Sequence, residues 1–338
     1  MHVPIRWGII GCGDVTEIKS GPAFNKVADS KLVAVMRRDG AKAADYARRH
    51  NVPKWYDNAD ALIADPDVDA VYIATPPGNH EEYALRVAAA GKPCYVEKPM
   101  ARNHAECQRM VDAFAQKNLP LFVAYYRRGL PRFVKTRELI NAGEIGELIA
   151  IEYTLASNQC ATRQDPPPWR VVPSVSGGGI FLDLASHLLD LFDFLFGPLT
   201  FAWSDAKRFG PGSVEDYVVL NFTTPAGVRG VGEWDFTSDE HQDHILIEGT
   251  RGKIELSCFG NEPVIFETAE RRQELSLPNP PHVQQPLIES MVNDLLGRGK
   301  CPSTGLSAAR TSALMDQALL PYYGSRGDGF WKNFPAQV

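Results

Sequence analysis

Short apolar runs alternate with amphipathic segments along the first third of the chain. Five apolar runs predict strands, at residues 6–10, 31–36, 70–74, 93–96 and 121–124. Segments with helical spacing of apolar residues predict helices from residue 14 to about 27 and at 41–50, 59–64, 81–90 and 105–116. Strands and helices that alternate at this spacing predict a parallel, doubly wound sheet.

The pattern changes after a further helix predicted at residues 131–142. Longer β-rich runs predict strands at residues 148–155, 201–203, 217–222, 228–236, 245–248 and 253–256. Turn sequences at 224–227 and 249–252 predict hairpins between them. Three more helices are expected, at 180–196, 285–296 and 306–320. The second part is therefore an α+β domain with a mostly antiparallel sheet.

Length and composition support two globular domains. A chain of 338 residues exceeds the usual size of a single hydrophobic core, so we place one domain at residues 1–124 and the other at 125–338. With 44% hydrophobic and 22% charged residues, the chain has an ordinary globular composition. The net charge of -6 and the lack of a long basic run argue against nucleic-acid binding.

The sequence argues against a membrane protein, a secreted protein and a metalloprotein. The most apolar segment, 180–196, contains three aspartates and a histidine, so no membrane span or membrane partner is expected. The N-terminal residues show no secretory signal pattern. Six scattered cysteines have no metal-ligand spacing. We expect a cytoplasmic protein with reduced cysteines and no metal site.

A glycine turn follows the first predicted strand. Gly11, Cys12 and Gly13 form a Gly-x-Gly sequence, and Asp14 and Val15 lead into the next helix. Glycines at this position let the backbone approach a pyrophosphate, and a helix start offers free N–H groups. Thr16 replaces the third glycine of the usual fingerprint. The turn predicts a dinucleotide site in a Rossmann domain.

The end of the second predicted strand indicates which dinucleotide is bound. Arg37 and Arg38 stand where an acidic residue normally accepts hydrogen bonds from the adenosine ribose. Two guanidinium groups cannot accept those bonds, but they can bind a 2'-phosphate. We therefore favour NADP(H) over NAD(H). The alternative is that both arginines are only solvated and that Asp39 reaches a ribose hydroxyl.

Lys98 is the first catalytic candidate. It lies in the sequence Glu97-Lys98-Pro99, directly after the strand predicted at 93–96. Pro99 favours an extended conformation at Lys98, so the ammonium group can point into a cleft at the end of the strand. The alternative is a surface pair of Lys98 and Glu97.

A polar stripe on an apolar helix supplies the second catalytic candidate. Asp183, His187 and Asp190 are spaced at i, i+4 and i+7, so they share one helix face. Imidazole carries protons near neutral pH, and a nearby carboxylate can orient it. The alternative is a core histidine paired with a carboxylate.

Together these motifs resemble the glucose-fructose oxidoreductase and inositol dehydrogenase (Gfo/Idh/MocA) family. The resemblance rests on the Gly-x-Gly turn, residues 74–80, residues 91–93 leading to Glu97-Lys98-Pro99, and the glycines before Asp183 and His187, and it covers the whole chain. It implies a Rossmann domain and a domain with a large open-faced sheet that mediates homodimers or homotetramers.

The resemblance also implies roles for individual residues. Lys98 would bridge cofactor and substrate, His187 would exchange the proton, and Asp183 would hold the substrate or orient the lysine; some members have tyrosine in place of His187. The remaining cofactor contacts implied are Thr75, Pro76, Asn79, His80 and Glu97. The remaining substrate contacts implied are Tyr126, Arg127, Trp169 and Arg170, although Trp169 could equally be a packing anchor.

The sequence therefore predicts an NAD(P)-dependent oxidoreductase that acts on the hydroxyl or keto carbon of a sugar, polyol or cyclitol. Two other functions remain open. One is a glycoside hydrolase that uses tightly bound nicotinamide in a transient redox step. The other is a cofactor-sensing regulator without catalysis, which would have no need of Lys98, Asp183 and His187 together.

Overall fold

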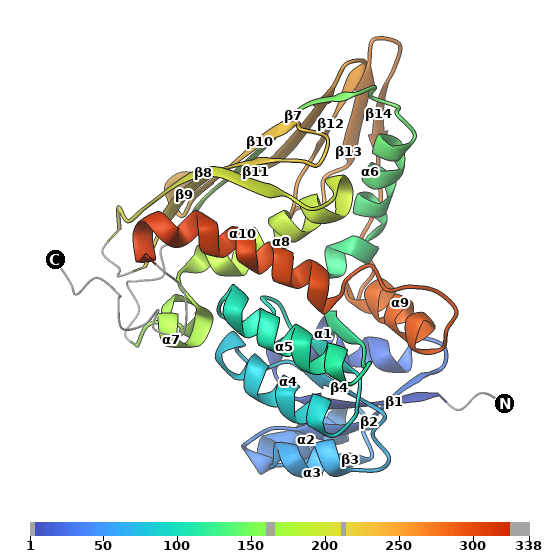
Figure 1. The fold of residues 1–338 in the computed structure, drawn as a ribbon. Helices are drawn as coiled ribbons and strands as arrows, with labels where there is room; N and C mark the ends of the chain where they lie inside the picture. Colours follow the sequence, from blue (N-terminus) through green and yellow to red (C-terminus); the bar gives the residue numbers. More distant parts are fainter. Residues whose placement is uncertain (1–3, 160–165, 211–213, 325–338) are drawn as a thin grey trace. The chain divides into compact units, whose positions relative to one another are not determined.

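The computed structural model describes residues 4–159, 166–210 and 214–324, and Figure 1 traces the chain through them. The chain divides into two compact units. The first contains the described residues of Met1–Ala101, Glu106–Leu130 and Pro280–Ala309, and the second contains those of Arg102–Ala105, Pro131–Asn279 and Arg310–Val338. The division into independent domains after residue 124 stays a prediction. Cys160 lies outside the described residues.

The first unit is built on a six-stranded parallel sheet with the order β3-β2-β1-β4-β5-β6. Its strands are β1 (Ile5–Ile10), β2 (Ser30–Met36), β3 (Lys54–Tyr56), β4 (Ala70–Ile73), β5 (Cys94–Val96) and β6 (Leu121–Val123). Its helices are α1 (Asp14–Ile18), α2 (Gly40–Arg49), α3 (Ala59–Ala64), α4 (His80–Ala89), α5 (His104–Gln116) and α9 (Gln285–Leu295). Short 3₁₀ segments are η1 (Gly21–Asn25), η2 (Pro77–Asn79) and η3 (Tyr126–Gly129). The predicted Rossmann architecture is confirmed.

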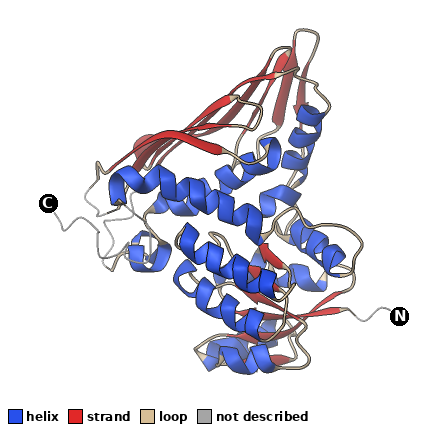
Figure 2. Cartoon of the chain, in the orientation of Figure 1, coloured by secondary structure: helices blue, strands red, loops and turns tan. Residues whose placement is uncertain are grey.

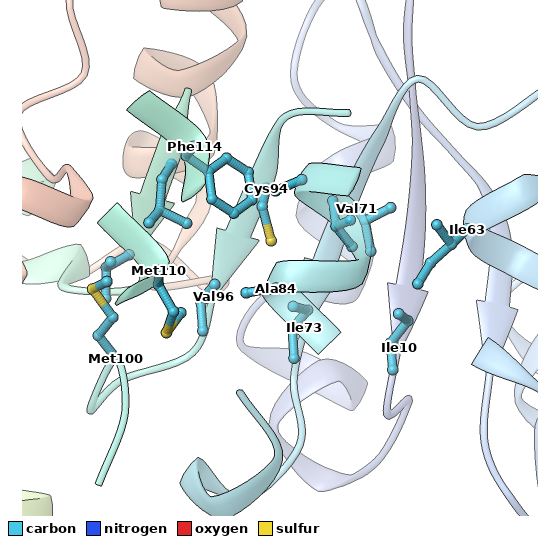
Figure 3. Close-up of a cluster of buried hydrophobic side chains, with 14 of the residues drawn as sticks. Ile10, Ile63, Val71, Ile73, Ala84, Cys94, Val96, Met100, Met110 and Phe114 are labelled. Carbon is cyan, nitrogen blue, oxygen red and sulfur yellow. The ribbon is translucent and has the colours of Figure 1, made fainter. Parts of the chain in front are cut away.

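Alternate residues of the central strands bury their side chains on opposite faces of this sheet. On one face, Val71 and Ile73 of β4 and Val96 of β5 pack with α3, α4 and α5, as Figure 3 shows. On the other face, Tyr72 and Tyr95 pack with η1, α2 and α9. Helix α9 is therefore part of the core of the first unit although it lies near the end of the chain.

Two local features of the first unit differ from the sequence-based expectation. The helix expected to reach residue 27 ends at Ile18, and η1 follows it, with Pro22 near its start. Proline lacks the N–H that a continuing helix would need. Strand β3 was not predicted, because its three residues are too short to show a period and Trp55 is half-exposed.

The second unit is built on an eight-stranded sheet with the order β14-β13-β12-β11-β7-β10-β9-β8. Its strands are β7 (Leu148–Asn158), β8 (Thr200–Lys207), β9 (Tyr217–Thr223), β10 (Arg229–Asp235), β11 (Thr237–Gly249), β12 (Gly252–Leu256), β13 (Val264–Thr268) and β14 (Arg272–Leu275). Only the β7–β10 pair is parallel among these described strands. The prediction of a mostly antiparallel sheet is confirmed, although β13 and β14 were missed.

Helices cover one face of the second sheet. They are α6 (Pro131–Asn141), α8 (Ile180–Phe196) and the later part of α10 (Gly305–Tyr323), and Figure 2 shows them beside the strands. The short helix α7 (Pro173–Ser176) belongs to the same unit. Phe181 of α8 meets Trp234 of β10 edge to face at 5.0 Å between ring centres. Along β9 and β10 buried residues alternate with partly exposed ones. None of the described helices is long and apolar enough to cross a bilayer.

Candidate cofactor and active site

A cavity of about 410 Å³ opens at the carboxyl edge of the parallel sheet, where the loops after β1, β2 and β4 meet. The sheet order reverses between β1 and β4, and ligands of doubly wound sheets bind at such a reversal. The cavity is lined by Gly11, Cys12, Gly13, Met36, Arg37, Arg38, Asp39, Lys42, Ala74, Thr75, Pro76, Asn79 and Tyr83. Most of the predicted cofactor residues are therefore brought together here.

The glycine turn brings bare backbone to the cavity. Gly11 has φ +90, and a Cβ on it would lie 2.8 Å from Cγ2 of Thr75. A Cβ on Gly13 would have only the Gly11 oxygen within 4 Å, at 3.8 Å. Gly11 is therefore required by the fold, whereas Gly13 leaves space for a close ligand. Helix α1 has only five residues, so a pyrophosphate here would rely on local N–H groups more than on a helix dipole.

Positive side chains surround one end of the cavity. Arg37 and the exposed Arg38 follow β2, and the Arg37 guanidinium donates to the Cys12 carbonyl at 3.4 Å. Asp39 caps α2 by accepting from the Lys42 N–H at 3.2 Å, and this bond lowers the pKa of the Asp39 carboxyl. Lys42 was not identified from the sequence, although its position in the first turn of α2, just after Arg38, could have indicated a cofactor contact. Three cations thus face one carboxylate that already serves as a helix cap.

The loop after β4 supplies polar groups to the same cavity. Thr75 Oγ1 is buried and has no hydrogen-bond partner among the described residues, and Asn79 also lines the space. Buried hydroxyls are normally bonded, so Thr75 fits a site for a ligand. Together with Gly13 and the cationic end, it makes the cavity suitable for a dinucleotide.

His80 lies outside the cavity lining. The ring is fully buried, its Nε2 lies 2.6 Å from the Thr75 carbonyl, and its Nδ1 lies 3.1 Å from the Pro99 carbonyl and 3.2 Å from that of Met100. Burial lowers the pKa of the imidazole. His80 thus joins the loop after β4 to the loop that follows Lys98. Asp14 and Val15 likewise do not line the cavity, since they lie at the start of α1.

Lys98 lies farther along the same sheet edge. It follows β5, is partly exposed, and its peptide bond to Pro99 is cis. Glu97, beside it, is only 6% exposed. Tyr126 and the buried Arg127 follow β6, with the guanidinium carbon 5.2 Å from the Tyr126 ring centre. The sheet topology therefore places Lys98 and the substrate candidates Tyr126 and Arg127 at the edge that carries the cavity.

The other candidates form a second group within the second unit. The Arg170 Nε donates to a carboxylate oxygen of Asp183 at 3.0 Å, and the Arg170 guanidinium lies 4.5 Å from the Trp169 ring centre. His187, one turn after Asp183 on α8, is 5% exposed and meets Phe259 edge to face at 5.8 Å. The sequence did not indicate Phe259, because its loop is far from α8 along the chain.

A hollow of about 430 Å³ adjoins this group. Leu184 of α8 and Phe259 line it, together with Leu155, Gln159, His241, Asp243, Ser257, Gly260 and Glu262. Asp243 accepts three backbone N–H bonds, from Cys258 at 3.0 Å, Phe259 at 2.6 Å and Gly260 at 3.1 Å. The loop that carries Phe259 is thereby held beside His187.

The glycine turn before α8 explains how that helix is positioned. Gly177 has φ +96, and a Cβ on Gly179 would lie 2.6 Å from the Glu215 carbonyl oxygen. Both carboxylate oxygens of the buried Glu215 accept from the Gly179 N–H, at 2.9 and 3.0 Å, and Tyr323 also donates to Glu215. A carboxylate at a helix start stabilises the helix. Gly179 is therefore needed for the docking of Glu215 at the start of α8.

No set of three or more His, Cys, Asp or Glu side chains within the described parts of the chain could hold a metal ion. The five described cysteines are buried free thiols. Burial raises the pKa of Cys12 and of Cys301 to about 11. These thiols are therefore protonated at neutral pH.

Comparison with known proteins gives matches over both units. A family model described as an oxidoreductase family with an NAD-binding Rossmann fold matches residues 5–125, and one described as the GFO/IDH/MocA C-terminal domain matches residues 133–255. Oxidoreductase P35 of Formosa agariphila is 39% identical over 324 residues, which cover 94% of this chain and 98% of that protein. Trans-1,2-dihydrobenzene-1,2-diol dehydrogenase of Bos taurus is 28% identical over 323 residues, covering 94% and 93%.

Solved structures share the fold. A levoglucosan dehydrogenase in complex with NADH and levoglucosan has a TM-score of 0.83 at 22% identity, and the match covers 93% of this chain and 97% of that one. Both the doubly wound part and the large antiparallel sheet are therefore found together in another protein.

Proposed function

Because the chain belongs to the Gfo/Idh/MocA family of NAD(P)-dependent oxidoreductases, we propose that it transfers a hydride between NADP(H) and a hydroxyl-bearing carbon of a sugar, polyol or cyclitol. The single observation that carries this proposal is the cavity at the sheet reversal, which combines the open glycine turn with Arg37, Arg38 and Lys42. The relatives named above, an oxidoreductase and a diol dehydrogenase, agree with chemistry on CH–OH groups.

In the proposed reaction, oxidation of the alcohol removes a hydride from the carbon and a proton from the hydroxyl, and reduction of the carbonyl adds both. Bound nicotinamide supplies the hydride acceptor or donor. In the oxidation direction, the hydroxyl proton passes to the imidazole of His187, and the Lys98 ammonium hydrogen-bonds the same substrate oxygen as it becomes a carbonyl. Asp183, held by Arg170 at 3.0 Å, orients substrate hydroxyls. These roles are assigned to Lys98 in the first unit and to Asp183 and His187 of α8 in the second.

Substrate recognition is assigned to four further side chains. Tyr126 and Arg127 in the first unit and Trp169 and Arg170 in the second each combine an aromatic ring with a guanidinium at 4.5 to 5.2 Å. Rings of this kind pack on the apolar face of a sugar, while guanidinium groups donate to its hydroxyls.

The preference for NADP(H) is supported by the charges around the cavity. A 2'-phosphate carries negative charge that guanidinium groups bind through short, charge-assisted hydrogen bonds. Asp39, the residue that could instead accept from a ribose hydroxyl, already accepts from Lys42. The cationic end of the cavity thus favours the phosphorylated dinucleotide.

The first experiment is a fluorescence titration of the purified protein with NADPH and NADH, beside an assay for cofactor released on denaturation. We expect tighter binding of NADPH and exchangeable cofactor, followed by reversible turnover in a screen of sugars and polyols. Equal or tighter binding of NADH would contradict the cofactor assignment, and absence of redox turnover with cleavage of glycosides would contradict the reaction.

Replacing both Arg37 and Arg38 by alanine is expected to raise the Kd of NADPH by about 10- to 100-fold, because two charge-assisted bonds are lost. The Kd of NADH should change by less than about threefold, since it has no 2'-phosphate. Arg48→Ala is the matched control, because Arg48 is an exposed arginine of α2 paired with Asp45 and lies outside the cavity lining. Equal losses for both cofactors would contradict the assignment.

A homodimer or homotetramer through the uncovered face of the second sheet is also part of the proposal. This face carries apolar side chains that alternate with the buried ones, including Val219, Leu246, Ile265 and Trp203, which is 55% exposed. An apolar surface of this kind is typical of an interface. Sedimentation velocity at micromolar concentration should show a dimer or tetramer, and a monomer would contradict this assembly.

A cytoplasmic location completes the proposal, with small molecules and no nucleic acid or membrane as partners. The buried free thiols are compatible with a reducing compartment.

A further inference from the structure

Glu97 is a buried carboxylate next to the proposed catalytic lysine. It follows β5, and its N–H still bonds the Ile73 carbonyl of β4 at 2.8 Å. A buried carboxylate is costly unless several donors compensate it. One of its oxygens, Oε1, accepts from the Tyr72 hydroxyl and from the Gln284 amide, both at 2.6 Å. Its other oxygen, Oε2, accepts from the backbone N–H of Lys98 at 3.1 Å.

Gln284 reaches this carboxylate from a part of the chain 187 residues later. It is fully buried at the start of α9, and its backbone N–H bonds the Lys19 carbonyl at 3.1 Å. Its side-chain oxygen accepts from the Tyr95 hydroxyl at 2.7 Å. This bond leaves the amide N–H₂ for Glu97. Only a side chain with both a donor and an acceptor satisfies both neighbours.

The two tyrosines act as fixed donors. Tyr72 and Tyr95 are paired across β4 and β5, and their rings stack at 4.6 Å between centres. Burial, and next the charge of Glu97, raise the pKa of both phenols well above the ordinary value. Both hydroxyls therefore keep their protons and donate.

The chain after Lys98 is held as well. The His80 ring lies within hydrogen-bond distance of the Pro99 and Met100 carbonyls. Lys98 thus lies between a backbone N–H bonded to Glu97 and two carbonyls that contact His80. Small displacements of a catalytic group are costly, and about 1 Å can lower a rate about 100-fold.

We propose that Gln284 and Tyr72 are positioning residues for Lys98, which act by fixing the Glu97 carboxylate that holds the lysine backbone. The inference rests on the proposed function, since it assumes that Lys98 acts on the substrate oxygen. It assigns to α9, near the end of the chain, a part in the alignment of the active site.

The test compares Gln284→Leu and Tyr72→Phe with the unmodified enzyme, at saturating NADPH and per folded, cofactor-binding site. We expect kcat to fall roughly 10- to 100-fold in Gln284→Leu and roughly 10-fold in Tyr72→Phe, with the Kd of NADPH within threefold. Hydride transfer should become more rate-limiting, so the primary deuterium isotope effect on kcat should increase. Tyr72→Phe keeps the test decisive if Gln284→Leu does not fold.

Tyr56→Phe is the matched control. The Tyr56 hydroxyl also donates to a buried carboxylate of the first unit, Asp65, at 2.9 Å, but it lies on the edge strand β3. It should lower stability without changing kcat or the isotope effect. If Gln284→Leu and Tyr72→Phe behave like this control, the proposed positioning role is wrong.

Combination with Lys98→Met separates this inference from the proposed function. If Gln284 acts through Lys98, Gln284→Leu should cause no further loss of kcat in the Lys98→Met background. Additive losses would overturn the inference. If Lys98→Met alone leaves kcat unchanged, the proposed function fails instead. A large loss from Lys98→Met with none from Gln284→Leu overturns only the positioning role.

Discussion

Lys98→Met is expected to lower kcat by roughly 10²–10⁴-fold, the range for loss of a positioned catalytic group. Methionine keeps much of the length of the side chain but cannot donate a hydrogen bond to the substrate oxygen or stabilise charge on it. The Kd of NADPH should stay within about threefold, because the cavity at the sheet reversal does not include Lys98. Single-turnover measurement of nicotinamide reduction checks the rate, and fluorescence titration checks binding.

Lys117→Met is the control for this substitution. Lys117 is exposed just after α5 in the same unit, so its loss should change neither rate nor binding. Unchanged turnover in Lys98→Met would remove the assigned mechanism. A parallel loss of NADPH binding would show that Lys98 also holds the cofactor, as the family resemblance implies.

His187→Gln is expected to lower kcat by roughly 10²–10³-fold, because glutamine can hydrogen-bond but cannot exchange a proton with the substrate hydroxyl. The KM should change less than kcat, since the polar contact is kept. Steady-state rates over a series of substrate concentrations measure both effects.

His50→Gln tests whether any paired histidine would give the same result. His50 lies 2.7 Å from a carboxylate oxygen of Glu17 at the end of α2, so it is a histidine paired with a carboxylate outside the cavity lining. We expect normal kinetics for His50→Gln. Normal kinetics for His187→Gln too, with a lowered melting temperature, would show that His187 only stabilises the fold.

The sequence predicted the parts of the molecule that depend on local pattern. Strand and helix alternation predicted the parallel sheet, and the spacing of Asp183 and His187 predicted their common helix α8. Arg37 and Arg38 were identified because the carboxyl end of a strand is a known place for ligand contacts. These features need only neighbours within a few residues, so a single sequence contains them.

What the sequence did not predict depends on contacts between distant segments. Nothing local marks Gln284 as a partner of Glu97, or Phe259 as a neighbour of His187. The three residues of β3 become a strand only because β2 offers an edge with free hydrogen-bonding groups. Tertiary contacts determine these features, and the local propensities of the residues do not predict them.

The return of residues 280–309 to the first unit affects the order in which the protein can be completed during synthesis. Leu287, Ile288, Met291 and Val292 of α9 are at most 1% exposed and fill one face of the first sheet. When only the first 130 residues have been synthesised, all six strands of the first sheet are therefore present. The helix α9 that covers this face and the Gln284 amide that bonds Glu97 are not. The loops that line the dinucleotide cavity are synthesised early, whereas Gln284, which holds the Glu97 carboxylate beside Lys98, is synthesised much later. A chain truncated before Gln284 would therefore have the glycine turn for the cofactor without an aligned Lys98.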